Sequence, residues 1–592
     1  MRAKRLLLMV LTLALLAGAG TQVEPLHREQ VRYDLTASPV QGVSPTILLA
    51  TTALGAFRGV LVDLVWIRMS QLQEKGRFFE IAQLADLATK MEPNFVAVWD
   101  FQAWNMAYNI TAEIPNLEDR WPWVKQGIEL LRDEGIPANP TQPELYFQLG
   151  WIYVHKVGGE LDDANVYYKL ALGIEMHEVL GGPGTKEFLQ KVVSAPGTDE
   201  QLLDDRRVRE LCDALRAAGF DPLAKTGDVL EYFTYLRNPE SIPGAACELL
   251  ESNRNAYAKD KLEVYARARR LEGLKLRPEK MIELIDQYGP FDWRTPYGHA
   301  IYWASLGMEQ VRGVRKRMAM TREELGHETL GEYEWVETVQ RLEYDPIQYD
   351  RVIYRSLRAL VTNGRLVYDD NGVLLSMTAP DYRFTDAMIR EYEMLMNRHE
   401  SKRYWEGISE GYKNFLIKLV EDYYYEGDNE ASAKYFEMIK AKFPFVLKPL
   451  YAREDWSKVT HEQFVLDRIE DNLSVMKAGE IRTFIAGQIS NSFYNQAIGN
   501  SKVAARYMGL AQNVTKAYVD SVRKTPTFNI DFNQMRQMVL RDIFAGRRGF
   551  PPEVIARLWE ILPQAERLAI EQYLKQNLPP EERKPDQQPA EP

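Results

Sequence analysis

The chain contains little cysteine and no closely spaced histidines. Its 592 residues include two cysteines, Cys212 and Cys247, and seven histidines. Neither residue type shows the C-x-x-C, H-x-x-H or H-x-x-x-H spacing from which zinc sites are commonly built. We therefore predict no metal and no other cofactor. The two cysteines lie in helical, apolar contexts, which leaves one disulfide and two buried thiols as alternatives.

Motifs of catalysis are equally scarce. The sequence has neither a G-x-x-x-x-G-K-[ST] phosphate-binding loop nor a G-x-G-x-x-G dinucleotide fingerprint, and His327-Glu328 lacks the second histidine of a zinc protease. The segment Gly407-Ile-Ser409-Glu-Gly411 matches G-x-S-x-G, but charged residues precede it where a nucleophile elbow needs an apolar strand. We predict a protein that is not an enzyme, although residues that meet only on folding escape such a search.

The N-terminus is basic and then free of charge. Arg2, Lys4 and Arg5 precede an uncharged run from Leu6 to Gly20, which ends in the small residues Ala17-Gly18-Ala19. This is the pattern of a secretory signal, and the run is shorter than the roughly 20 residues of a membrane span. We predict an exported protein, periplasmic or held at the outer face of the cytoplasmic membrane. Residues 1–20 are then either a cleaved signal or an N-terminal anchor.

The chain as a whole is acidic, with a formal net charge of −11 at pH 7. Phosphate backbones attract basic proteins, so we predict no nucleic-acid partner. A second uncharged region, Gly42 to Phe57, is followed by Arg58 and Asp63, whose burial in lipid is costly. This region therefore predicts a buried amphipathic helix instead of a second membrane span. Its apolar side comprises Leu54, Phe57, Leu61, Leu64, Val65 and Leu72.

Helical periodicity extends over most of the chain after residue 45. The corner Glu92-Pro93-Asn94 separates two predicted helices, because proline disfavours the helical conformation of the residue before it. Two apolar runs flank Asp369-Asp-Asn-Gly372, which predicts a small β-hairpin near 365–375. The predicted organisation is a linker at 21–45, N-terminal helical repeats at 46–175, an irregular helical region at 176–290, helices with the hairpin at 291–400, C-terminal repeats at 401–577 and a disordered tail at 578–592.

Aromatic and small residues recur at fixed offsets. Residues 144–172 contain Tyr146, Leu149-Gly150 and Tyr153, followed by Ala164, Tyr168 and Ala171, and resemble a tetratricopeptide repeat. The resemblance implies an all-α fold of stacked helical hairpins in a right-handed superhelix, or solenoid, whose concave surface binds a protein or peptide partner. Weaker copies include Trp303, Leu306 and Gly307; Leu416, Leu419, Tyr423, Phe436 and Pro444; and Gly499, Ala504, Met508 and Ala511.

The first candidate site is a set of charges near three tryptophans. Arg58, Asp63 and Arg68 are five residues apart and so do not share one face of a helix. If the helix is buried, each needs a partner on another element. The set is then either a group of inter-helix ion pairs that fix the packing register, or part of a polar groove. That groove would also contain Trp66, Trp99, Trp104, Asn105 and Tyr108.

The second candidate site follows Gly289. Asp292, Trp293 and Arg294 precede a predicted helix that carries His299 and Trp303. One interpretation is a packed corner in which Asp292 starts the helix. The other is a surface for a peptide or a glycan, because aromatic faces beside Arg and Asp suit both ligands.

The predicted function is that of a non-catalytic, envelope-associated scaffold for protein–protein interaction or complex assembly. One alternative is a glycan-binding or glycan-active α/α protein, which would have a Trp-lined cleft and, for hydrolysis, two carboxylates facing one another across it. Another is a membrane-anchored adaptor of a transport or secretion complex. An uncleaved N-terminus would distinguish that adaptor from the scaffold.

Overall fold

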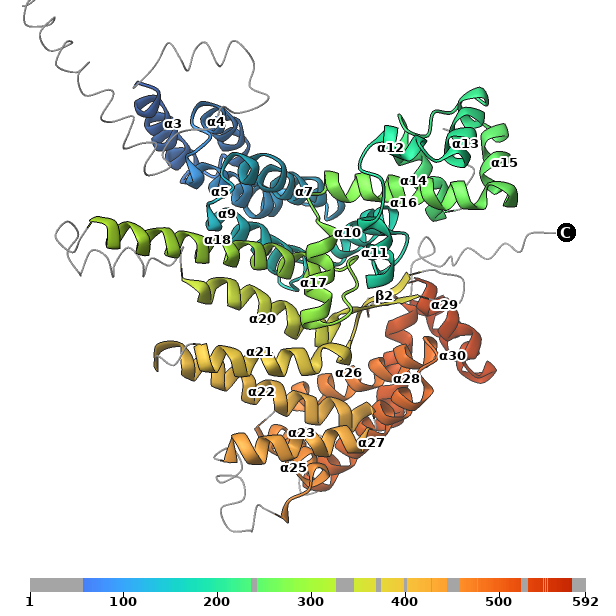
Figure 1. The fold of residues 1–592 in the computed structure, drawn as a ribbon. Helices are drawn as coiled ribbons and strands as arrows, with labels where there is room; N and C mark the ends of the chain where they lie inside the picture. Colours follow the sequence, from blue (N-terminus) through green and yellow to red (C-terminus); the bar gives the residue numbers. More distant parts are fainter. Residues whose placement is uncertain are drawn as a thin grey trace, which may run out of the picture. The chain divides into compact units, whose positions relative to one another are not determined.

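The chain is predominantly helical in the computed structural model (Figure 1), which confirms the predicted helical class. It divides into two compact units, Met1–Ser356 and Leu357–Pro592, a coarser division than the regions predicted from sequence. The predicted signal or anchor, the linker and the tail lie outside the described residues. Described are residues 57–235, 242–325, 345–368, 374–398, 402–426, 428–444, 458–475, 478–522, 531–546, 548, 550 and 552–577.

The first unit begins with the helices α3 (Phe57–Gln73), α4 (Phe78–Met91) and α5 (Val96–Trp104). The corner between α4 and α5 lies where the proline predicted it. Val62, Met69 and Leu72 of α3 are buried against α4, but Leu61 and Leu64 are exposed. The predicted buried side of this helix is therefore wrong in part, because α3 is apolar on two faces and only one of them is covered.

The charges on α3 also differ from the prediction. Asp63 and Arg68 are exposed to solvent, so neither needs a buried partner. The side chain of Arg58 lies outside the described residues. The proposal of buried ion pairs that fix the register of this helix is accordingly wrong for Asp63 and Arg68.

The next segment is unusual in containing π-helices, which are rare and often occur at functional sites. All the π-helices of the described residues lie between residues 105 and 157. The order is η1 (π, Asn105–Ile110), α6 (Thr111–Glu113), η2 (Glu118–Arg120), α7 (Trp121–Glu129), η3 (π, Leu130–Gly135), α8 (Ile136–Ala138), α9 (Pro143–Trp151) and η4 (π, Ile152–Val157).

A helical region follows in which Cys212 and Cys247 belong to one apolar cluster. Both are buried thiols that form no disulfide, and burial raises the pKa of Cys212 to about 11. The helices are α10 (Asn165–Leu180), α11 (Lys186–Val193), α12 (Asp199–Leu203), α13 (Arg206–Ala217), α14 (Thr226–Tyr235), α15 (Gly244–Glu251), η5 (Asn253–Asn255), α16 (Ala256–Gly273), α17 (Pro278–Tyr288), α18 (Pro296–Leu325) and α20 (Pro346–Asn363).

The glycines of the predicted repeats lie at close helix contacts. A β-carbon on Gly150 of α9 would lie 3.2 Å from the Ala300 carbonyl oxygen of α18. One on Gly307 would lie 2.5 Å from the ring of Tyr349. Helix α9 thus packs chiefly against α18, far along the chain, and less against its neighbour α10. The superhelix of tetratricopeptide hairpins stays a prediction.

The second unit contains two short strands and a set of regular helices. Strands β1 (Arg365–Tyr368) and β2 (Leu374–Ala379) pair antiparallel, while the predicted Asn-Gly turn lies outside the described residues. The helical elements are η7 (Tyr382–Phe384), α21 (Thr385–Arg398), α22 (Lys402–Glu426), α23 (Asn429–Lys442), α25 (His461–Val475), α26 (Ala478–Ala497), α27 (Ser501–Val522), α28 (Phe532–Phe544), α29 (Pro552–Ile561) and α30 (Gln564–Asn577).

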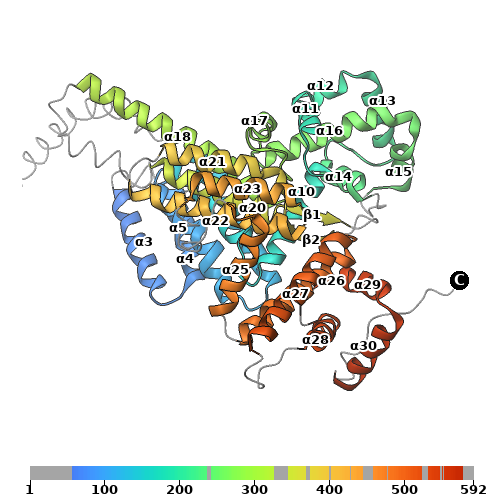
Figure 2. The same ribbon diagram turned by 90° about the horizontal axis from the view of Figure 1, so that it is seen from below.

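Two helix pairs of this unit lie where the sequence predicted repeats. Helix α22 packs beside α23, and α26 beside α27 (Figure 2). A serine hydroxyl links each pair, since Ser432 donates to the Val420 carbonyl at 2.8 Å and Ser492 to the Ala504 carbonyl at 2.7 Å. Gly499 has φ +84°, a left-handed conformation that suits glycine at the turn. Ser409 is buried within α22, so the G-x-S-x-G match is not a strand–turn–helix elbow.

Candidate binding site

Five rings of the first unit form what we call the aromatic ladder. Trp104 and Tyr108 come from α5 and η1, and Phe147, Trp151 and His155 come from α9 and η4. The rings of Trp104 and Tyr108 stack with centroids 4.1 Å apart and planes 20° apart. Trp151 stacks on His155 at 4.7 Å and on Phe147 at 6.0 Å. Successive members on each helix are four residues apart, which places them on one face.

Tyr108 joins the two halves of the ladder. Its hydroxyl lies 3.2 Å from Nδ1 of His155. Burial raises the pKa of the phenol well above its usual range. Burial, followed by the charges of Arg355 and Lys156, lowers the pKa of His155. At neutral pH the phenol and the imidazole are therefore both neutral, and the ladder itself carries no charge.

The ladder lies at the surface of the unit. Trp104 is 38% exposed, and the other four rings are half-buried. Arg355 of α20 is exposed and places its guanidinium carbon 5.2 Å from the ring of Trp151. The surface thus offers aromatic faces together with one cation, a combination that suits aromatic, apolar or carboxylate groups of a ligand.

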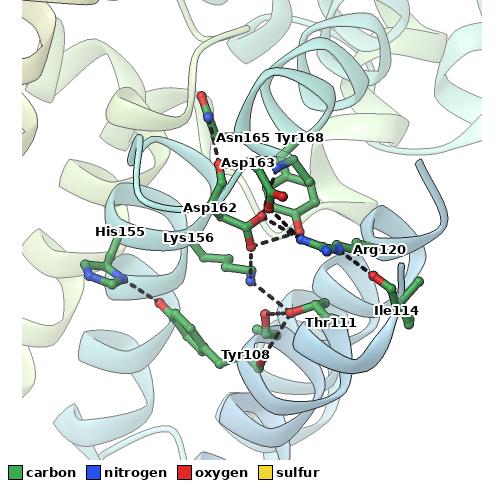
Figure 3. Close-up of polar contacts among 12 residues, drawn as sticks. Tyr108, Thr111, Ile114, Arg120, His155, Lys156, Asp162, Asp163, Asn165 and Tyr168 are labelled. Carbon is green, nitrogen blue, oxygen red and sulfur yellow. Dashed lines mark hydrogen bonds and ion pairs between the residues drawn. The ribbon is translucent and has the colours of Figure 1, made fainter. Parts of the chain in front are cut away.

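A buried lysine supports the ladder from behind (Figure 3). Lys156, next to His155 in η4, donates from Nζ to Thr111 Oγ1 at 2.9 Å and to Asp162 Oδ2 at 2.5 Å. The same ammonium lies 5.2 Å from the centroid of the Tyr108 ring and 5.6 Å from that of Tyr168. Lys156 therefore ties the π-helix η4 to the end of η1 and fixes the two ladder helices relative to one another.

Asp162 completes this polar network. It accepts hydrogen bonds from the Ala164 backbone at 2.9 Å and the Tyr168 hydroxyl at 3.2 Å, and it pairs with Arg120 at 3.1 Å. Burial alone would raise the pKa of this carboxyl, but the hydrogen bonds from Lys156 and Ala164 outweigh burial and lower it. A buried ion pair persists only when its remaining hydrogen bonds are satisfied, and here they are.

The turn before Asp162 contains two glycines, Gly158 and Gly159. The Gly158 backbone N–H donates to the Tyr153 carbonyl at 2.9 Å. A β-carbon on Gly158 would lie 2.8 Å from the ring of Tyr297, and one on Gly159 would collide with the His155 carbonyl oxygen. Glycine therefore lets the chain fold back closely enough for Asp162 to reach Lys156.

The structure separates the first predicted groove into two groups. Trp104 and Tyr108 belong to the ladder. Trp99 and Asn105 are buried, with Trp99 Nε1 donating to the Pro93 carbonyl at 2.7 Å and Asn105 Nδ2 to the Phe78 carbonyl at 3.1 Å. Trp66 packs between Phe95 and Phe101. These last three side chains hold the helices together and do not line a groove.

The second predicted site is a packed corner. Trp293, His299 and Trp303 are buried, and Arg294 forms two hydrogen bonds with the Asp292 carboxylate, at 2.9 and 2.8 Å. His299 Nε2 lies 2.9 Å from the Trp293 carbonyl, and burial lowers the pKa of this imidazole to about 4. None of the four predicted side chains here is exposed to a partner. Asp292 lies before the first helical residue, Pro296, and holds Arg294 instead of capping α18 directly.

Sequence reasoning missed Phe147, Trp151 and His155 as a site. Their spacing of four residues was visible in the sequence, as it was for Trp104 and Tyr108. Spacing alone does not show which face of a helix is exposed. The network of Lys156 and Asp162 left no local signal, since its members come from separate elements.

Within the described ranges, no group of three or more His, Cys, Asp or Glu side chains is placed to hold a metal ion. Among the same residues, every helix is either too short or too polar to cross a bilayer. No protein-family model, curated protein or solved structure matches the chain.

Proposed function

We propose that the protein is a non-catalytic helical-repeat scaffold of the cell envelope that holds a polypeptide segment of a partner on the aromatic ladder. The observation that carries this proposal is the row of stacked rings on two adjacent helices at the surface. Rings of this kind are the side chains that contribute most to protein–protein affinity. Envelope location rests on the N-terminal sequence pattern alone.

The polar network behind the ladder supports binding over simple packing. Lys156 and Asp162 fix the ladder helices before any ligand arrives. A surface that is already ordered loses little conformational entropy on binding. The exposed guanidinium of Arg355 beside Trp151 favours a segment that pairs an aromatic or proline residue with a carboxylate.

Site-specific photocrosslinking in the native envelope tests this proposal. A photoreactive phenylalanine analogue at Trp104 should give an adduct with one reproducible protein, and mass spectrometry should locate it in one segment of that protein. The control position is Trp405 of the second unit, which is 40% exposed and lies outside the ladder. Trp151→Ala should abolish the adduct at position 104. Equal adducts at both positions, or none at 104, would contradict the proposal.

One observation favours a second function, glycan hydrolysis. Asp100 lies one turn before Trp104 on α5, so the two side chains share a face. Its Oδ1 atom is buried without a hydrogen-bond partner, and burial raises the pKa of the carboxyl to about 6. A carboxyl whose pKa is raised to about 6 is suited to act as a general acid under mildly acidic conditions. Release of reducing sugar from envelope polysaccharide, lost in Asp100→Asn, would establish this function instead of the scaffold.

A further inference from the structure

Helix α3 is apolar on two opposite faces. Val62 and Met69 on one face are buried against α4. Val60, Leu64 and Ile67, at positions i, i+4 and i+7 of the other face, are 56%, 58% and 54% exposed. Together with Leu61 they form a continuous stripe that we call the outer α3 face. Isolated exposed apolar residues are ordinary, but a continuous stripe indicates an interaction surface.

The packing of the described residues leaves this face open. Helix α4 is the main packing partner of α3, and it contacts the inner face. Figures 1 and 2 show α3 at the edge of its unit. A terminal element of a helical array normally has a polar outer side, because no further repeat covers it. The outer α3 face is apolar instead, so we expect another molecule to cover it.

The charge around α3 indicates what the occupant is. Residues 57–77 contain four basic and two acidic residues, whereas the whole chain contains 73 basic and 84 acidic residues. Arg68 is exposed, and Lys75 follows directly after the helix. Anionic lipid headgroups attract basic residues by about 1 kcal/mol for each residue near the surface. An apolar stripe with basic flanks is the composition of a helix that lies in a membrane interface.

The preceding sequence points in the same direction. Two uncharged runs, Leu6–Gly20 and Gly42–Phe57, lie at and before the start of α3, and the second ends at Phe57, the first residue of the helix. If either run associates with a bilayer, the first turns of α3 are held close to that bilayer. A soluble partner protein would explain the apolar stripe but not this combination of adjoining uncharged sequence and local positive charge.

We propose that the outer α3 face lies in the interface of an anionic lipid bilayer, with the helix along the membrane surface. Val60, Leu64 and Ile67 enter the boundary between headgroups and acyl chains, and Arg68 reaches the phosphates. The contact is one-sided, so it does not require α3 to span the membrane. It is independent of the aromatic ladder, and either proposal can fail without the other.

An environment-sensitive fluorophore on α3 tests this directly. Leu64→Cys in the full chain is labelled with NBD; Cys212 and Cys247 are buried and unlabelled wild type serves as the check on their reactivity. Vesicles of phosphatidylglycerol and phosphatidylcholine should shift the emission to the blue, and brominated acyl chains should quench it. The control is Leu161→Cys, an apolar position that is 89% exposed and should show neither effect.

Each other outcome overturns the proposal. Emission at position 64 that ignores vesicles would show that the face stays in water. A blue shift without vesicles that grows with protein concentration would assign the face to a second copy of the chain, and one independent of concentration would assign it to another segment of the same chain. Equal quenching at 64 and 161 would show non-specific adsorption.

A second substitution protects the test against an effect of the label. Ile67→Asp in the labelled Leu64→Cys background places a charge in the proposed interface, so quenching by brominated lipid should be largely lost. Val193→Asp is the matched control, because Val193 is exposed on α11 in the same unit. Both positions are at the surface, so both variants should fold. Unchanged quenching in Ile67→Asp would contradict the proposal even if the first experiment succeeded.

Discussion

The ladder helices and the C-terminal helices are held together by different interactions. Helices α26 to α30 share a core of aliphatic and aromatic side chains such as Ile489, Phe493 and Leu558. The ladder helices bury charged groups as well, among them Lys156, with Asp162 beside it. All the π-helices of the described residues lie between residues 105 and 157, which also contain most of the ladder, whereas the helices α26 to α30 are regular α-helices.

The two kinds of interior contribute differently to stability and to the choice of one helix arrangement. An apolar core stabilises many similar arrangements, because shape and volume can be adjusted by repacking. A buried ion pair stabilises less, but it permits only the arrangement in which every hydrogen bond is made. We infer that the first unit uses its polar network to keep the two halves of the ladder in register, while the helices α26 to α30 rely on burial of apolar area.

Removal of Asp162 should have the largest effect. Asp162→Ala leaves Lys156 buried beside Thr111 without a carboxylate, and breaking a buried pair in this way costs about 3–5 kcal/mol. Hydrogen exchange should show lost protection in η4 and α10. Asp163→Ala is the matched control, since this side chain is 74% exposed and pairs with the same Arg120, and it should cost less than about 1 kcal/mol. Similar losses from both variants would contradict the distinction drawn here.

Replacement by methionine compares the two interiors with one side chain. Leu558→Met in the apolar core should cost less than about 1.5 kcal/mol, because volume is nearly conserved. Lys156→Met should cost about 2–3 kcal/mol, because it leaves Thr111 and part of Asp162 without their donor. Urea unfolding followed by hydrogen exchange in each unit gives both values. If the lysine variant is the more stable of the two, the network does not have the strict geometry inferred for it.

Acid should destabilise the first unit before the C-terminal core. Burial lowers the pKa of His299 to about 4, and the pKa values of His155 and His177 are also lowered. Between about pH 6.5 and 4 these imidazoles bind more protons in the unfolded state, so their contribution to stability falls as pH falls, by roughly 3 kcal/mol for His299. Asp100, whose pKa burial raises to about 6, offsets part of this loss below about pH 6, because its carboxyl binds the proton more tightly in the folded state. Residues 478–577, which include the helices α26 to α30, contain no histidine. Hydrogen exchange at pH 7 and pH 5 should show the loss in the first unit, and His299→Gln should reduce it.

The sequence predicted those parts of the fold whose contacts are local. The pair α26 and α27 followed from helical periodicity and from Gly499 in the turn between them. The contact of α9 with α18 did not follow, because Gly150 and Ala300 are far apart in the chain and nothing near either residue names its partner. Leu61 and Leu64 of α3 were predicted to be buried but are exposed, because both sides of this helix are apolar.

Only part of the candidate site could be predicted from the sequence, for the same reason. Trp104 and Tyr108 were recognised because they are neighbours on one helix. Trp99 and Asn105 had the same appearance in the sequence but turn inward, where each makes one hydrogen bond to a carbonyl. The packing of neighbouring helices decides which of these side chains is exposed to solvent. Helical periodicity alone could not separate the exposed side chains from the buried ones.

Trp104→Ala should have the smallest effect on stability and still test the ladder. The ring is partly exposed and stacks on Tyr108, so its loss should cost about 0.5–1.5 kcal/mol of folding free energy. A central aromatic contact in an interface is worth more than 2 kcal/mol of binding, so affinity for the crosslinked partner segment should fall by more than about 30-fold. Trp405→Ala should leave that affinity unchanged. A variant that loses stability and affinity in equal measure would make Trp104 a packing residue, and the ladder would then belong to the same class as the C-terminal core.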